Sequence, residues 1–112
     1  MKKIEAIVRS VKVGAVCQAL DEVGHPGVMV SEVEGYGRQH GVEQQFRGKT
    51  HKVRMMTKGR IQVVAKDNDV PKIISAIREA ACTGQVGDGK IFIYPVDNAL
   101  RIRTGESGDE AV

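Results

Sequence analysis

The sequence contains no tryptophan, and aromatic residues make up only 4% of its 112 positions. This composition does not favour a surface that binds sugars or single-stranded nucleic acid by stacking. The two cysteines, Cys17 and Cys82, are too few for a disulfide scaffold or a cysteine-based zinc site. No apolar run approaches the roughly 18 residues of a membrane span, and the N-terminus lacks the apolar core of a signal peptide. We therefore expect a cytoplasmic protein.

Apolar residues account for 41% of the chain, which is enough for one small core and excludes a disordered protein. The length suits a single domain over residues 1–112. The formal net charge of +3 is unevenly distributed, because Glu43 is the only acidic residue between 36 and 60. Seven basic residues lie in that segment: Arg38, Arg47, Lys49, Lys52, Arg54, Lys58 and Arg60. The basic charge suits partners that carry phosphate.

Apolar positions predict strands and helices in a regular order. Period-2 alternation or a short apolar run favours a strand in four segments, namely residues 2–9, 28–34, 60–66 and 91–96. Apolar residues at helical spacing predict helices over 11–24 and 69–82, with Ser10 and Asn68 as their N-caps. The order β-α-β-β-α-β indicates an α+β ferredoxin-like sandwich, with both helices on one face of a four-stranded sheet.

Residues 35–57 separate the second and third strands and show no apolar period. A loop of this length in a compact domain is usually functional.

In the last strand, Phe92 and Tyr94 alternate with Ile91 and Ile93, so both of its faces are apolar. A sheet with two apolar faces needs a covering partner, and oligomerisation would supply one. Residues 98–112 are expected to form a C-terminal loop and polar tail.

The glycine-rich segment GQVGDGK (84–90) fits the first seven positions of the Walker pattern. A P-loop is not supported, because Ile91 replaces the Ser or Thr that would hold magnesium and a strand follows instead of a helix. Backbone N–H groups beside Lys90 could still bind an anion, although a helix C-cap with a tight turn explains the same glycines. In Arg101-Ile102-Arg103, an extended chain would place both guanidinium groups on one side, where they could bind phosphate or remain solvated.

Other candidate sites have weaker support. GYGRQHG (35–41) departs from the dinucleotide-binding pattern, because its third glycine comes one place late and no helix follows. His25, His40 and His51 lack metal-ligand spacing, so no metal site is predicted from them. The residues alone indicate no pairing of a nucleophile with a base.

Four motifs together resemble the PII nitrogen-regulatory signal proteins. They are GYGRQ (35–39), FRGK (46–49), TGQVGDGKIF (83–92) and RIRTGE (101–106), and the resemblance runs nearly end to end. It implies a homotrimer, not an enzyme, with ATP or ADP in each cleft between subunits. The nucleotide-binding residues that it implies are Met29, Gly37, Arg38, Gln39, Val64, Gly87, Asp88, Gly89, Lys90, Arg101 and Arg103. Arg101 and Arg103 would reach the phosphates from the neighbouring subunit.

The resemblance also implies that Gln39 helps to hold magnesium on ATP, and that this ion coordinates 2-oxoglutarate. Lys58 would pair with the distal carboxylate of 2-oxoglutarate. Residues 36–57 would contact the regulated protein, an ammonium transporter or a metabolic or regulatory enzyme, with Arg47 as a contact residue. His51 and Lys49 stand where family members carry a modified tyrosine or serine, so control is expected to come from bound effectors.

Two other classes of function stay open at this stage. The basic segment could contact nucleic acid, although it has few aromatic residues and we do not expect this partner. The same cleft could also support a slow, incidental ATPase. A further alternative is a PII-like sensor of adenylate or a small anion that acts outside nitrogen metabolism.

Overall fold

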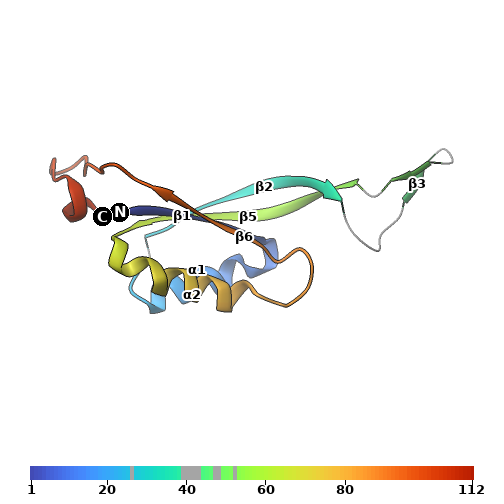
Figure 1. Cartoon of the computed structure of the whole chain (residues 1–112), viewed down its shortest axis with the longest axis horizontal. Coiled ribbons are helices and arrows are strands. Elements are labelled where there is room, and N and C mark those ends of the chain that lie inside the picture. The colour runs from blue at the N-terminus through green and yellow to red at the C-terminus, as the bar shows by residue number, and fades with distance from the viewer. Residues whose placement is uncertain (26, 39–43, 47–48, 52) are drawn as a thin grey trace.

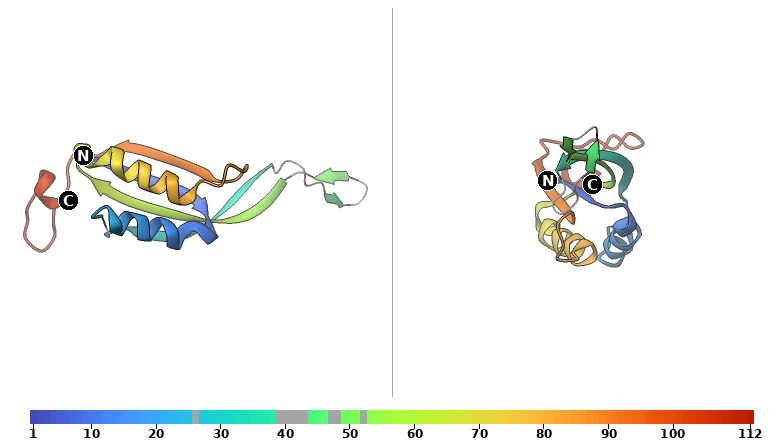
Figure 2. Two further views of the ribbon diagram at one scale, coloured as in Figure 1. Left: turned by 90° about the horizontal axis from the view of Figure 1, so that it is seen from below. Right: turned by 90° about the vertical axis from the view of Figure 1, so that its right-hand side faces the viewer.

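The computed structural model of the chain describes residues 1–25, 27–38, 44–46, 49–51 and 53–112, with side chains described outside 37–54. The main elements are β1 (Lys2–Arg9), α1 (Val13–Glu22), β2 (Met29–Arg38), β5 (Val53–Ala65), α2 (Val70–Ala81) and β6 (Gly89–Pro95). The sheet order is β2-β5-β1-β6, and each neighbouring pair is antiparallel. Both helices cover one face of this sheet (Figures 1 and 2), which confirms the ferredoxin-like fold.

The core lies between the helices and the covered face of the sheet. Because strand side chains alternate, every second residue of the two central strands points toward the helices. Ile4 in β1 and Ile61 in β5 are fully buried there. Leu20 of α1 and Ile73 of α2 close the layer from the other side and are also fully buried. The apolar periods of the sequence therefore position the sheet and both helices.

The second and third main strands are longer than the sequence predicts. They pair in one continuous register that runs from Met29 opposite Gln62 to Arg38 opposite Val53. The short strands β3 (Gln44–Phe46) and β4 (Lys49–His51) form a separate two-stranded ribbon beyond them (Figure 1). The expected loop bounds at 35 and 57 are therefore wrong. Backbone pairing extends β2 and β5 into residues whose side chains show no apolar period.

Both predicted N-caps are wrong. The Ser10 hydroxyl donates to the Thr57 carbonyl, with an O···O distance of 3.0 Å, instead of capping α1. A 3-10 turn, Ser10–Lys12, precedes α1, and neither helix has a side-chain cap hydrogen bond. Asn68 lies inside a second 3-10 turn, Asp67–Asp69, and α2 begins one residue later than expected, at Val70.

Among the described residues, no helix has both the length and the apolar character needed to cross a bilayer.

Candidate functional site

The glycine-rich segment forms the connection from the end of α2 to the start of β6. Gly89 opens β6 opposite Val8 with a φ of +105°. A Cβ atom at Gly89 would lie 1.7 Å from the Ile7 carbonyl oxygen. Glycine is therefore required on two grounds, a left-handed backbone and a close approach to β1. This contact fixes where the loop joins the sheet.

The side chain of Asp88 closes the loop on itself. Its carboxylate accepts hydrogen bonds from the Thr83 hydroxyl, from the Thr83 N–H at 2.8 Å and from the Gly84 N–H at 2.9 Å. These bonds, first that of the Thr83 hydroxyl, lower the pKa of Asp88 well below its usual range. The structure thus places the Asp88 carboxylate among donors of its own loop.

Two cations on neighbouring strands hold the other side of the loop. Arg9 donates from Nη2 to the Val86 carbonyl at 2.8 Å and from Nε to the Asp88 carboxylate at 3.2 Å. Lys58, which pairs with Arg9 across β1 and β5, donates from Nζ to the Gly87 carbonyl at 2.7 Å. Arg9 was not predicted from the sequence. A basic residue at the end of a strand gave no sign of a partner 79 positions away.

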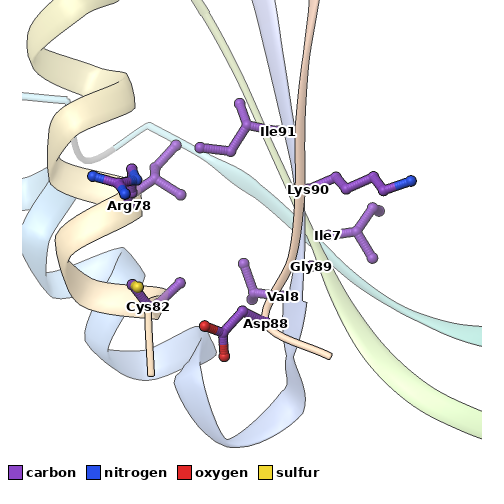
Figure 3. A pocket seen from close by; sticks show the side chains of 10 residues that line it. Ile7, Val8, Arg78, Cys82, Asp88, Gly89, Lys90 and Ile91 are labelled. Atoms are coloured by element: carbon purple, nitrogen blue, oxygen red, sulfur yellow. The ribbon is translucent and has the colours of Figure 1, made fainter. Parts of the chain in front are cut away.

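Backbone N–H groups remain available on this loop. Among the hydrogen bonds between described residues, none uses the N–H of Val86 or Gly87, whereas the Asp88 N–H closes a hydrogen-bonded turn over Val86 and Gly87. Two successive free donors in a glycine-rich loop can bind an anion. Lys90 follows immediately, and Figure 3 shows its side chain on the far side of the strand from α2. The expected anion site therefore has suitable donors and a nearby positive charge.

A groove of about 260 Å³ lies beside the loop, between α2 and β6. Its walls include Val8, Ile77 and Ile91, and Arg78 and Cys82 line it from α2 (Figure 3). Asp88, Gly89 and Lys90 also line it, so the groove is continuous with the loop.

One chain does not bring all the predicted nucleotide residues together. Val64 pairs with Lys3 on β1, whereas Gly89 pairs with Val8. These rows lie five positions apart on β1, a distance of about 16 Å at roughly 3.3 Å per residue. Met29, which is 72% exposed, lies near the Val64 end of the sheet.

Arg101 and Arg103 belong to the segment that follows β6, and this segment lies at the end of the sheet opposite the loop (Figure 1). The expected extended conformation is wrong, because residues 102–104 form a turn that is closed by the Gly105 N–H, which donates to the Arg101 carbonyl at 2.8 Å. The guanidinium of Arg101 donates to the Glu106 carboxylate at 2.9 Å, and Arg103 is exposed. The tail then forms a 3-10 helix, Gly108–Ala111.

The sheet face away from the helices carries exposed apolar side chains. Phe92 and Tyr94 on β6 are 44% and 41% exposed, and the Lys3 ammonium lies 4.6 Å from the centre of the Tyr94 ring. Polar pairs lie among them, including Arg60 with Ser31 at 3.1 Å and Gln62 with Glu5 at 3.0 Å. This face has the mixed character of a subunit interface.

The remaining predicted residues belong to the end of β2 and the segment beyond it. Gly37 and Arg38 end β2 opposite Arg54 and Val53, and the structure does not describe the side chain of Arg38. Gln39 and Arg47 lie outside the described residues. Among the described residues, no group of three or more His, Cys, Asp or Glu side chains could hold a metal ion.

Comparison with known proteins gives similarity over the whole chain. The family model described as "Nitrogen regulatory protein P-II" matches residues 1–106. The chain is 48% identical to the nitrogen regulatory protein P-II of Azospirillum brasilense, with all of both chains aligned. It is 46% identical to the nitrogen regulatory protein P-II 2 of Methanothermobacter thermautotrophicus, with 100% of this chain and 97% of that protein covered.

A solved structure of a PII protein is also similar to this chain over nearly its whole length. The crystal structure of Arabidopsis thaliana PII bound to citrate superposes with a TM-score of 0.80 at 39% identity. The alignment covers 99% of this chain and 91% of that one.

Proposed function

Because this chain belongs to the family of nitrogen regulatory proteins P-II, we propose that it binds ATP or ADP in clefts between the subunits of a homotrimer. P-II proteins are non-enzymatic signal transducers, and the family binds ATP, ADP and 2-oxoglutarate. In this chain, bound effectors would set the state of the segment 36–57, which would act on a protein partner in nitrogen and carbon metabolism.

The loop 83–90 is the observation that carries the proposal. The free N–H groups of Val86 and Gly87 are suited to bind phosphate oxygens, and Lys90 adds a positive charge. Gly87 and Gly89 would let the phosphates approach the backbone closely. Asp88 would contribute through its carboxylate, which is bonded within the loop and holds the shape of the loop.

A second subunit would complete the site. Met29 and Val64 would border the base, and Arg101 and Arg103 would reach the phosphates from the neighbouring chain. The position of Arg101 and Arg103 supports this division, because in a single chain they follow the end of β6 that lies opposite the loop 83–90. The exposed Phe92 and Tyr94 would be covered in the trimer. Gly37 and Arg38 would join from the end of β2.

The second effector would be 2-oxoglutarate. Magnesium would arrive with ATP, Gln39 would offer it an amide oxygen, and the metal would supply the anchor that 2-oxoglutarate requires. Lys58 would pair with the distal carboxylate. The Arabidopsis relative was solved with citrate, also a polycarboxylate, which supports an anionic effector of this class. Lys58 already contacts the Gly87 carbonyl, so effector and phosphate loop would share one side chain.

The partner would be an ammonium transporter or a metabolic or regulatory enzyme, with Arg47 among the contact residues. A pull-down from native lysate with ATP and 2-oxoglutarate, compared with ADP, would identify it. Capture of the same proteins under both conditions would contradict effector control of the segment 36–57.

Calorimetric titration with ATP tests the nucleotide site. Charge-assisted hydrogen bonds contribute roughly 1.5–3 kcal/mol, so Arg103→Ala should weaken ATP binding by about tenfold or more. Lys72→Ala is the matched control, since it removes one positive charge from α2 at an exposed pair with Asp69. Light scattering should give a trimer mass for each variant. Equal ATP affinity of the trimeric Arg103→Ala variant and the wild type would refute the proposed site.

A further inference from the structure

The loop 83–89 is held in its observed shape by contacts that involve no ligand. Arg9 contacts both the Val86 carbonyl and the Asp88 carboxylate, and Asp88 in turn accepts from Thr83 and Gly84. The guanidinium also lies against the loop backbone, because a Cβ atom at Gly87 would be 3.2 Å from Arg9 Nη2. These contacts join the end of β1 to a segment almost 80 positions later.

The contacts with the loop carbonyls also fix the direction of the neighbouring backbone N–H groups, because both groups belong to the same planar peptide. The structure contains no cis peptide bond among its described residues. In a trans peptide, the carbonyl of one residue and the N–H of the next point in opposite directions. Arg9 holds the Val86 carbonyl at 2.8 Å, so the Gly87 N–H points away from Arg9. Lys58 holds the Gly87 carbonyl at 2.7 Å, and the Asp88 N–H of the same peptide points away from Lys58 and closes the turn over Val86 and Gly87.

We propose that Arg9 is a positioning residue for the phosphate site, which it organises through the Val86 peptide group and the Asp88 carboxylate without contacting the nucleotide phosphate itself. The inference rests on the proposed function. Asp88 has the same kind of role, because its carboxylate joins Arg9 to the first turn of the loop. Both residues fix the direction of donors before ligand arrives, which lowers the ordering cost of binding.

The charge of Asp88 and its proposed positioning role predict opposite changes in ATP affinity when the carboxylate is neutralised. A carboxylate beside bound phosphates repels them, so its neutralisation should strengthen ATP binding if Asp88 acts only through its charge. A positioning role predicts weaker binding after Asp88→Asn. One oxygen of Asp88 accepts from the Thr83 hydroxyl and Arg9, and the other accepts from two N–H groups. An amide NH₂ cannot accept, so asparagine loses one of these two sets.

The corresponding change at Arg9 keeps the charge. Arg9→Lys retains one positive charge, but a single ammonium on a shorter chain cannot reproduce the forked contact with Val86 and Asp88. Loss of one charge-assisted contact corresponds to about tenfold in affinity. We expect about this loss for Arg9→Lys and for Asp88→Asn, and little further loss in the double variant, because both act on one network.

The experiment compares ATP titrations of the full-length wild type, Arg9→Lys, Asp88→Asn, the double variant and Lys90→Ala. Asp97→Asn is the matched control, since it removes one exposed carboxylate after β6. Weaker binding in both single variants, non-additivity and an unchanged control would support the inference. Unchanged Arg9→Lys or tighter Asp88→Asn binding, with weakened Lys90→Ala, would overturn the inference and leave the proposed function standing.

Amide hydrogen exchange of the nucleotide-free trimers gives a second measurement. Arg9→Lys should speed exchange at Thr83 and Gly84, whose N–H groups are bonded to Asp88. Circular dichroism shows whether each variant folds. A wild type that binds no ATP would overturn the proposed function, and exchange would then decide alone: unchanged loop exchange in Arg9→Lys would refute the positioning role.

Discussion

Gly89 allows a direct test of how the loop is joined to the sheet. In Gly89→Ala, the new Cβ atom would lie 1.7 Å from the Ile7 carbonyl oxygen, about half of a normal contact distance. The obstacle is backbone, so no side-chain rotation can relieve it. The start of β6 must therefore move away from β1, and the loop that carries Asp88 and Lys90 must move with it.

The expected loss of stability follows from two terms. An L-residue with a left-handed backbone costs roughly 1–2 kcal/mol, and Gly89 has a φ of +105°. Separation of the strands stretches ladder hydrogen bonds worth about 1 kcal/mol each and opens the edge of the core. Together these effects should destabilise the protein by about 3–5 kcal/mol, a large share of the roughly 5–15 kcal/mol that is typical of a domain.

Gly84→Ala is the matched control in the same loop. Gly84 also has a positive φ, +83°, but a Cβ atom at this position would point into open space, with no atom from elsewhere among the described residues within 4 Å. Gly84→Ala should therefore lose only the stability that corresponds to the backbone strain, about 1–2 kcal/mol. Thermal unfolding followed by circular dichroism, at one fixed trimer concentration, compares the two variants, and ATP titration reports the loop. Equal melting temperatures for Gly84→Ala and Gly89→Ala would refute the assigned contact with Ile7.

Three further results are expected. Ile77→Ala should cost about 2–5 kcal/mol of unfolding free energy by denaturant titration, whereas Ile102→Ala, at a side chain that is 97% exposed, should change it by less than about 0.5 kcal/mol. The pKa of Asp88 is lower in the folded state, so its contribution to stability is present above its ordinary value near 3.8 and is lost as pH falls below it. The difference in melting temperature between wild type and Asp88→Asn should therefore shrink below about pH 5, and a constant difference would contradict this. Isothermal titration should detect 2-oxoglutarate only with ATP and magnesium, and Lys58→Gln should weaken it, whereas binding to nucleotide-free protein would contradict the role of Gln39.

Sequence patterns were sufficient where a structure depends on neighbouring residues. Alternation around Ile4 and helical spacing around Ile77 predicted the strands and helices, because the side-chain direction repeats with the backbone period. The glycines of 84–90 predicted an irregular backbone, and the combination of motifs predicted the family. Strand ends were predicted less well, since pairing of β2 with β5 depends on backbone hydrogen bonds that leave no apolar pattern.

Contacts between distant residues were decided by the tertiary structure alone. Ser10 was a plausible cap by local rules, but its hydroxyl bonds Thr57 because the strand pairing brings that carbonyl close. An extended chain was expected at Arg101 and Arg103, but the Gly105 N–H donates to the Arg101 carbonyl and turns the chain after Arg101. Arg9 reaches Asp88 across 79 positions. The sequence by itself therefore determined the order of elements and the family, and the folded chain decided which peptide groups of the loop Arg9 and Lys58 hold.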